Sequence, residues 1–501
     1  MLAWTIYISF LGAAVLPLLP AKDARAARLL ALSTAALGLS FAVAETLQAA
    51  PGQLETIVNV PWIPSMGIRF HLAADGISLT LVLLTGIAAI AGILFSWNIE
   101  YRAKEFFALY LALIGGVYGV FLSFDLFLLF VFYEIAIIPK YFLIAIWGST
   151  RREYGAMKLA LYSFGGSAMV LIGLLAAFVI AGGHTMSLQQ LAEFPFPHAF
   201  QMWAFPLVFV GFGILAGLWP FHTWAPTGHV AAPTAASMLL AGVVMKLGAY
   251  GCLRVAMTLF PQGLGPWGFH VLGFASWLDL FSVLGLIGIL YGATVALVQT
   301  DFKYVIGYSS VSHMGFVLLG LMTLNPIGLS GAVLQMFSHG IIAGLLFAVV
   351  GRMVYDRTHT RQLANLERMN LSRLMPFAAV TFTVACVASM GLPGFSGFAA
   401  ELQVLVGAWR AFPTLAVVAG IGLVVGVAYT LRALLKAFFS DQPAAPAHSG
   451  MPPITMPEKI GAVILMVTSL LIGLFPSLLL NLIVPSLSSS LFNGLRQIAG
   501  P

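Results

Sequence analysis

The chain has 501 residues, of which 60% are hydrophobic and only 8% are charged, and its mean hydropathy is +0.99. Because soluble domains carry about 25% charged residues, this composition excludes a soluble globular protein and predicts a polytopic membrane protein. We expect the net charge of +6 to reflect the orientation of the chain in the bilayer, with no nucleic acid as a partner. The two cysteines, Cys252 and Cys386, lie in apolar segments and cannot form a metal cluster.

Fourteen apolar segments are long enough to cross a bilayer as helices. Further spans follow the first segment, so we interpret it as a helix and not as a cleavable signal peptide. The expected fold is an all-α polytopic membrane protein with 14 transmembrane helices. The predicted spans are 3–20, 27–47, 77–97, 106–122, 124–147, 157–181, 203–219, 234–257, 271–298, 304–324, 328–353, 374–410, 414–438 and 458–485.

The seventh and twelfth spans contain residues that interrupt a helix. The seventh runs into "LWPFHTWAPTGHVAAPT", which has three prolines, and the twelfth contains "GLPGFSGFAAE". Such breaks persist inside a bilayer only where protein or water satisfies the backbone. Because the breaks are five spans apart, they predict two inverted five-helix repeats. The predicted divisions are 1–105 (helices 1–3), 106–260 (first repeat), 261–440 (second repeat) and 441–501 (a connector, 441–457, and helix 14).

Basic residues orient these helices in the membrane. Seventeen of the 23 Lys and Arg residues fall in six loops that follow odd-numbered spans, and only Arg69, Arg410 and Arg496 fall on the opposite side. Cytoplasmic loops carry an excess of Lys and Arg. We therefore expect these six loops in the cytoplasm and both termini on the outer side.

The fifth span, in "VFYEIAIIPKYFLIAIWG", carries two ionisable residues, Glu134 and Lys140. Each such charge costs about 2.5–3.5 kcal/mol on insertion scales, so a functional role is the default interpretation. On a straight helix the two side chains are about 120° apart and 9 Å along the axis, so they are not an i, i+4 pair. The structural alternatives are a neutral buried acid for Glu134, and for Lys140 a side chain that snorkels or faces a neighbouring subunit.

Four more polar residues fall inside later spans. Burial weakens the preference of a lysine for its charged form, so Lys246 in the eighth span is a candidate for proton exchange. His313 and His339 lie on adjacent spans with serines nearby, and such a set can carry a hydrogen-bonded water file. Glu401 follows the break in the twelfth span. The alternatives are core histidines and, for Glu401, an acid at a helix terminus.

Other chemistries find no support in the sequence. His222 and His229 follow the seventh span and are expected to be structural, and no helix offers paired metal ligands at i, i+4. No Walker loop, Rossmann fingerprint, CxxC pair or haem motif occurs. Any cofactor chemistry is therefore expected in other subunits.

Several stretches are similar to one known family. They are "YEIAIIPKYFLIAIWG", "PFHTWAPTGHVAAPTAASMLLAGVVMKLGAYG", "TDFKYVIGYSSVSHMGFVLLG", "LQMFSHGIIAGLLFAVVG", "YDRTHTR" and "GLPGFSGFAAE", which together span roughly residues 70–440. The chain thus resembles the antiporter-like membrane subunits of respiratory complex I, the bacterial NADH-quinone oxidoreductase. The resemblance implies fourteen spans, two inverted repeats, broken helices 7 and 12, and proton translocation driven by quinone reduction in other subunits.

The resemblance also assigns roles to residues. Glu134 matches the glutamate of span 5, Lys246 the central lysine of span 8, and His313 and His339 match polar residues of the axial water path. Glu401 matches the span 12 residue near the exit half-channel, where the sister L and N subunits typically carry lysine. This glutamate and the short C-terminal region favour the branch called subunit M or chain 4.

One position departs from the family pattern. The lysine of span 7 that pairs with the span 5 glutamate is replaced by Leu215, while span 5 carries Lys140 where the family usually has an apolar residue. The two departures suggest that Lys140 takes over from the missing lysine. It would then pair with Glu134, pair with an acid on an adjacent subunit, or act as the next relay.

The leading prediction is a proton-translocating subunit of complex I in a bacterial cytoplasmic (inner) membrane. Its expected partners are the lipid bilayer and the other membrane-arm subunits, with the L and N subunits on either side. The quinone, flavin and iron–sulfur clusters are expected in partner subunits and no cofactor in this chain. Two alternatives stay open: a subunit of a Mrp-type cation/proton antiporter or membrane hydrogenase, and a structural spacer that does not pump.

Overall fold

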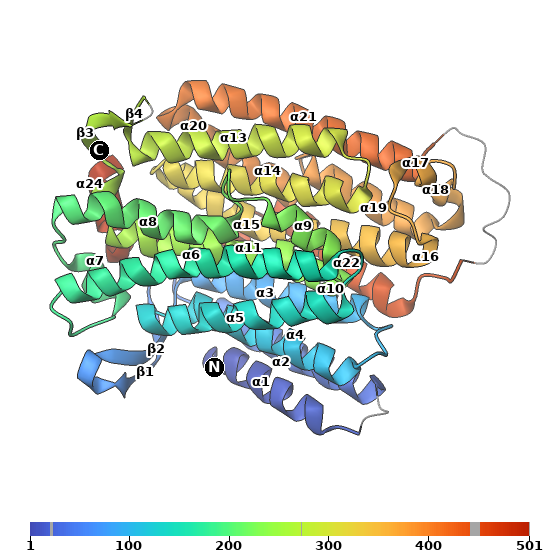
Figure 1. Cartoon of the computed structure of the whole chain (residues 1–501), viewed down its shortest axis with the longest axis horizontal. Helices are drawn as coiled ribbons and strands as arrows, with labels where there is room; N and C mark the ends of the chain where they lie inside the picture. Colours follow the sequence, from blue (N-terminus) through green and yellow to red (C-terminus); the bar gives the residue numbers. More distant parts are fainter. Residues whose placement is uncertain (21–23, 272, 441–450, 500–501) are drawn as a thin grey trace.

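The computed structural model describes residues 1–20, 24–271, 273–440 and 451–499, and these form an elongated bundle of roughly parallel helices (Figure 1). Within these ranges, twelve helices are long and apolar enough to span a membrane, or 13 if a bent pair near the C-terminus counts as one span. The prediction of a polytopic helical membrane protein is confirmed. The prediction that the fold is purely helical is wrong, because two short β-hairpins occur. Most of the predicted connector, residues 441–450, lies outside the described residues.

The N-terminal part of the bundle contains one of the hairpins. Its strands pair antiparallel, with Glu55 opposite Ala74 and Ile63 opposite Ile68. The elements are α1 (Ala3–Val15), α2 (Ala24–Gln48), β1 (Glu55–Ile63), β2 (Ile68–Ala74), α3 (Gly76–Phe95), α4 (Ala103–Leu122), α5 (Leu126–Trp147), α6 (Arg152–Ile180), α7 (Leu188–Glu193) and α8 (His198–Ala216).

The eighth span is irregular and is buried along nearly its whole length. It follows α9 (Trp224–Ala231) and consists of α10 (Thr234–Leu239), α11 (Met245–Gly251) and α12 (Met257–Leu259). The π-helical segments Leu240–Val244 and Cys252–Ala256 join these pieces. Insertions of π-helix into an α-helix occur often at functional sites.

The C-terminal half begins with the second hairpin, where the sequence predicted the start of the ninth span. A further π-helical segment, Ala348–Tyr355, extends the eleventh span. The elements are β3 (Pro266–Val271), β4 (Phe274–Ser276), α13 (Trp277–Val298), α14 (Phe302–Met322), α15 (Pro326–Phe347), α16 (Asp356–Thr358), α17 (Leu363–Leu366), α18 (Leu371–Leu374), α19 (Pro376–Ser389), α20 (Ser396–Ala411), α21 (Pro413–Phe438), α22 (Met456–Leu474), α23 (Ser477–Leu487) and α24 (Asn493–Ala499).

Two predicted spans are divided in the structure. The twelfth forms α19 and α20, with Gly391 and Gly394 between them at positive φ. The fourteenth ends with α22, and α23 starts after Pro476 as a separate helix. Proline removes a backbone donor, which explains why 458–485 is not one continuous helix.

One local arrangement occurs twice, at opposite ends of the bundle. Asp125 caps α5 and bridges to Ser187 before α7, while Asp301 caps α14 and bridges to Gln362 before α17. In both places the residue after the aspartate donates its amide to the opposite segment at 2.8 Å, and the return bond is 2.9 Å. The opposing segments read "HTMSLQQLAE" (184–193) and "HTRQLANLER" (359–368). The labels α7 and α17 lie at opposite ends in Figure 1.

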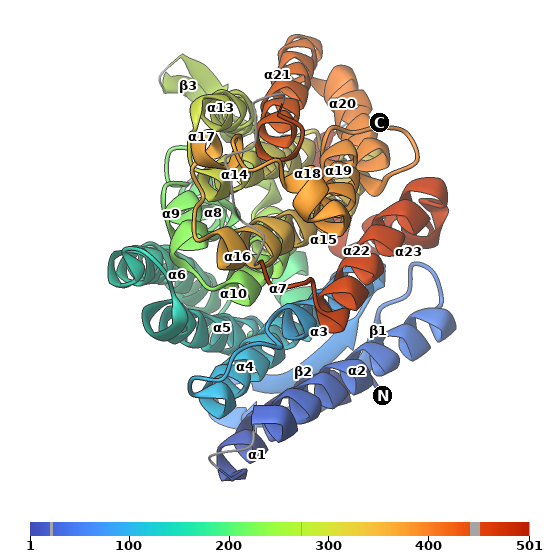
Figure 2. The same cartoon turned by 90° about the vertical axis from the view of Figure 1, so that its right-hand side faces the viewer.

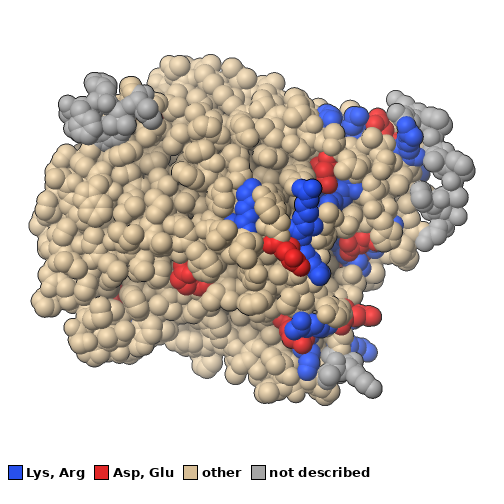
Figure 3. Space-filling view, viewed as in Figure 1, with Lys and Arg blue, Asp and Glu red and all other residues tan. Residues whose placement is uncertain are grey.

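Charged side chains gather at one end of the bundle, as the face drawn in Figure 3 shows. This is the end of α16 and α17 in Figure 1, and we call it the basic end. Viewed from there, α15 and α10 lie in the interior, with α1 and α2 at one edge and α13 and α21 at the other (Figure 2). The helices α11, α14, α15 and α20 carry Lys246, His313, His339 and Glu401, respectively.

Candidate functional site

Lys246 lies in α11, immediately after the first π-helical segment, and is fully buried. Its Nζ donates a hydrogen bond to the carbonyl oxygen of Ala241 within that segment. Nζ also lies 2.8 Å from Nδ1 of His339 in α15. An amine in hydrogen-bond contact with an imidazole can pass a proton to it or receive one.

Further contacts extend the series from His339 to α14 and α20. The rings of His339 and His313, the latter in α14, have centroids 5.4 Å apart. His313 Nδ1 lies 3.0 Å from Oε1 of Glu401 in α20, and its Nε2 lies 3.2 Å from the hydroxyl oxygen of Ser389. Gln335 Nε2 is 3.4 Å from both His313 Nδ1 and Glu401 Oε1. Lys246, His339, His313 and Glu401 therefore form one buried series of side chains, which we call the central line.

The break between α19 and α20 shapes the pocket of Glu401. Gly391 has φ +71°, and a Cβ atom there would lie 2.8 Å from Glu401 Oε2. Gly394 also has a positive φ of +99°, but a Cβ atom there would meet only Leu474, at 4.0 Å. Glycine adopts this backbone region without the clash that other residues suffer. The acid thus fits beside the break because residue 391 has no side chain.

The two ionisable residues of α5 lie within electrostatic range of each other but have different surroundings. Glu134 is half-buried beside the hydroxyl of Ser167 in α6, and its Oε1 has no hydrogen-bond partner among the described residues. Lys140 is fully buried and its Nζ has no such partner either. Ala136, one turn before Lys140, packs against Gly116 of α4. The two charges do not form a direct ion pair in the described chain, as the helix geometry predicted.

Lys140 faces the protein interior, because none of its surface is exposed. The alternative that it snorkels to the membrane surface is therefore wrong. Leu215 in α8, at the position of the missing lysine, is also buried. Gly248 of α11 packs directly on the backbone of Leu215 and Ala216, with a contact of 2.4 Å for an added Cβ. Residue 215 thus adjoins the helix that carries Lys246.

His222 and His229 are buried, and neither ring nitrogen of either residue has a hydrogen-bond partner in the described part of the chain. His222 packs against Tyr291 at a centroid distance of 5.0 Å, and His229 packs against Phe347 at 5.0 Å. His229 also lies within electrostatic range of Lys246 and Lys303. A purely structural role does not explain why both ring nitrogens of His229 are buried without a hydrogen-bond partner among the described residues.

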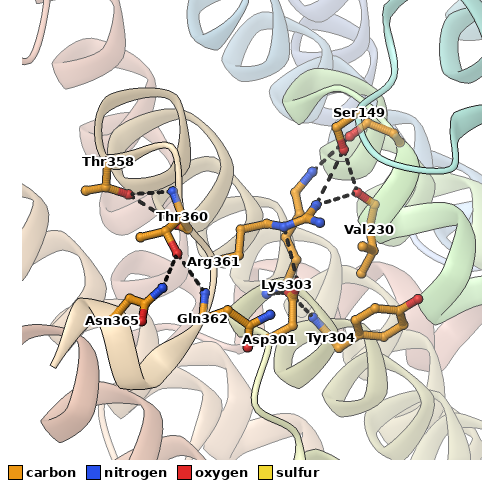
Figure 4. A network of polar contacts seen from close by, with 11 residues as sticks. Ser149, Val230, Asp301, Lys303, Tyr304, Thr358, Thr360, Arg361, Gln362 and Asn365 are labelled. Atoms are coloured by element: carbon orange, nitrogen blue, oxygen red, sulfur yellow. Dashed lines mark hydrogen bonds and ion pairs between the residues drawn. The ribbon is translucent and has the colours of Figure 1, made fainter.

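Sequence reasoning missed two charged clusters. Arg254, eight residues after Lys246, forms a buried ion pair with Asp75 at 2.7 Å, against the rings of Phe124 and Tyr250. At the basic end, Arg361 pairs with Asp301 at 3.2 Å and donates hydrogen bonds to Ser149 and Val230 (Figure 4). Two features of the sequence could have indicated these clusters. Arg254 is a basic residue inside a predicted span, and similar segments that begin with "HT" occur at 184–193 and 359–368.

The structure thus defines a polytopic membrane protein with a buried series of ionisable side chains that crosses its central helices and ends beside the break between α19 and α20. Within the described ranges no three His, Cys, Asp or Glu residues are grouped to hold a metal ion. Such a series has the chemistry of proton exchange between neighbouring groups.

Comparison with known proteins agrees with this class. Residues 123–426 match the family described as NADH:quinone oxidoreductase/Mrp antiporter, TM. The NAD(P)H-quinone oxidoreductase chain 4 3 of Picosynechococcus sp. is 37% identical, over 89% of this chain and 81% of that protein. The NADH-quinone oxidoreductase subunit M of Rhodobacter capsulatus is 37% identical, over 87% of this chain and 84% of that protein.

A solved structure extends the match to the whole chain. A chain of the respiratory complex I from Thermus thermophilus with bound NADH superposes with a TM-score of 0.88 at 27% identity, covering 100% of both chains. The chain therefore belongs to the NADH:quinone oxidoreductase/Mrp antiporter family. The resemblance to antiporter-like subunits of the chain 4 or subunit M type is confirmed.

Proposed function

We propose that this chain is a proton-translocating membrane-arm subunit of an NADH-quinone oxidoreductase. The observation that carries the proposal is the central line, in which each member contacts the next from Lys246 to Glu401. Protons pass along it between neighbouring groups, and the energy comes from quinone reduction in partner subunits. Those subunits hold the flavin, iron–sulfur clusters and quinone, while this chain supplies only proton transfer.

The same proposal includes the arrangement in the membrane. The basic end faces the bacterial cytoplasm, since Lys and Arg concentrate in cytoplasmic loops. Both termini then lie outside, and the L and N antiporter-like subunits are the lateral neighbours. We further propose fourteen transmembrane helices that include two inverted repeats, and the twice-occurring aspartate turn, at opposite ends of the bundle, supports the repeats.

The decisive variant is Lys246→Met in the whole complex. Removing a general acid–base group costs about 100-fold or more in a typical proton transfer, so we set the smallest loss that the proposal predicts for the whole complex at about tenfold. We expect NADH-driven proton uptake by inside-out vesicles to fall by about this factor while the complex still assembles. The matched control is Lys158→Met, which removes a half-buried lysine near the basic end. Normal proton uptake in Lys246→Met would refute the proposal in favour of a spacer.

A further inference from the structure

A cavity of about 270 Å³ opens near the basic end of the bundle. Several of its wall residues are polar: Ser96, Asn98, Ser149, Thr234, Lys303 and Asp356. These come from the loop after α3, the loop after α5, α10, α14 and α16. The cavity is large enough for several water molecules, since one water occupies about 30 Å³ of liquid.

Lys303 is the buried cation in this wall, with only 2% of its surface exposed. Its Nζ donates a hydrogen bond to the carbonyl oxygen of Ala232 at 2.8 Å. No carboxylate oxygen of the described residues lies within ion-pair distance of this amine. Lys303 is thus held by a neutral carbonyl group at the boundary between the cavity and the protein interior.

The carboxylates near Lys303 form hydrogen bonds and ion pairs with other residues. Asp301 uses Oδ1 to accept the backbone amides of Lys303 and Tyr304, and its Oδ2 pairs with Arg361 at 3.2 Å (Figure 4). Asp356 pairs with Arg352 at 2.9 Å. Because both acids are occupied, no adjacent ion pair locks the Lys303 amine in its charged form.

His229 connects this amine to the central line. It lies within electrostatic range of both Lys303 and Lys246, and both of its ring nitrogens lack hydrogen-bond partners among the described residues. It precedes Ala232, the hydrogen-bond acceptor of Lys303, by three residues. His229 thus lies near both lysines, close in sequence to the carbonyl group that holds Lys303, and can link the cavity with the central line.

The corresponding aspartate turn at the other end of the bundle shows that this turn does not require a lysine at the position of Lys303. At the opposite end of the bundle, the same turn at Asp125 has Phe127 in the position of Lys303 and Met186 in the position of Arg361. Both turns have the same backbone hydrogen bonds. A neutral side chain is thus compatible with the turn, and the charge at residue 303 calls for another explanation.

We propose that Lys303 is the proton-loading residue of the basic end, which takes protons from the cavity and delivers them through His229 to Lys246. In each cycle the Lys303 ammonium gives a proton to an imidazole nitrogen of His229, and the imidazolium passes it to the neutral Lys246 amine. The neutral Lys303 amine then takes a new proton from water in the cavity. This inference rests on the proposed function and assigns its point of proton entry.

The test uses substitutions that separate charge from proton exchange. Arginine keeps the positive charge but does not release its proton in proteins. We expect both Lys303→Met and Lys303→Arg to lower NADH-driven proton uptake by about tenfold in vesicles that contain the assembled complex. Lys158→Met serves as the control for loss of a positive charge near the same end, and we expect it to pump normally.

Chemical restoration of the amine gives a positive readout. In Lys303→Cys, an aminoethyl methanethiosulfonate added from the basic side attaches an amine through a mixed disulfide and releases sulfinate. We expect this treatment to recover proton uptake, whereas the methyl analogue, which adds no amine, should not. The native cysteines, Cys252 and Cys386, are both buried, and treated wild-type complex controls for their modification.

Each outcome bears on one claim. Normal pumping by Lys303→Arg would show that only the charge matters and would overturn the loading role. Equal recovery with the methyl and aminoethyl reagents would also overturn it. Normal pumping by Lys246→Met would refute the proposed function itself, so the two failures are distinguishable. If Lys303→Met does not assemble, the Lys303→Cys comparison, before and after treatment of the same assembled complex, decides.

Discussion

The two buried lysines of the first half have different surroundings. Lys246 contacts His339 and the Ala241 carbonyl, whereas Lys140 Nζ has no hydrogen-bond partner in the described structure. Burying an ammonium costs several kcal/mol even after the protein relaxes. An unpaired buried lysine therefore weakens the fold, so we expect Lys140 to serve transport and to be dispensable for assembly.

This expectation leads to a prediction for Lys140→Met. The substitution removes an unpaired buried charge, so we expect the complex to assemble at least as well as the wild type. We also expect proton uptake by vesicles to fall by about tenfold, because the relay next to Glu134 is lost. Adding Leu215→Lys, which places an amine beside α11, should restore part of the rate. If Lys140→Met pumps normally, Lys140 has not replaced the missing lysine.

Individual residues of the site were predictable, but their arrangement was not. Lys246, His313, His339 and Glu401 are conspicuous because each is a polar residue within an apolar span. Their order in the central line depends on four different helices, which no local pattern specifies. The sequence places Lys303 in a loop between the predicted spans 271–298 and 304–324, where a basic residue is expected for topology alone. Its burial arises because the break after α9 brings Ala232 against it.

At the scale of elements, the break between α19 and α20 shapes the surroundings of Glu401, the last residue of the central line. Glycine and proline predicted this break, and the structure adds that Gly391 leaves room for the Glu401 carboxylate. The π-helical segments of the eighth span were not predictable, because one extra residue per turn hardly changes a uniformly apolar pattern. The first hairpin, 55–74, was missed because it lies between predicted spans. The second, 266–276, was missed because its second strand falls at the start of the predicted ninth span, 271–298.

The break yields a prediction with a matched control. Gly391→Ala and Gly394→Ala each place a Cβ atom at positive φ, which costs about 1–2 kcal/mol. Only the Cβ atom at residue 391 would approach Glu401 Oε2, at 2.8 Å. We therefore expect similar losses of thermal stability in both variants but reduced proton uptake mainly in Gly391→Ala. Equal pumping by the two variants would show that the fit between Gly391 and Glu401 is unimportant.

At the scale of the whole molecule, the polar features follow two directions: inward from the basic end, and across the bundle. The charged surface residues gather at one end, and the cavity beside Lys303 opens there. The central line runs across the bundle, from α11 through α15 and α14 to α20. A proton that enters near Lys303 would thus reach Lys246 before it moves sideways towards Glu401. Composition and breaks predicted the class of fold, but this lateral path follows only from helix packing.

The most direct measurement is the number of protons translocated per electron by reconstituted complex carrying His313→Gln, the middle of the central line. Glutamine can keep a hydrogen bond to Glu401 but cannot take up a proton, so assembly should be preserved while transfer is blocked. The control is His184→Gln, which changes an exposed histidine. We predict that His313→Gln lowers either the proton-to-electron ratio or the coupled turnover, while His184→Gln changes neither. Wild-type values of both quantities in His313→Gln would contradict the assignment of the central line as the proton path.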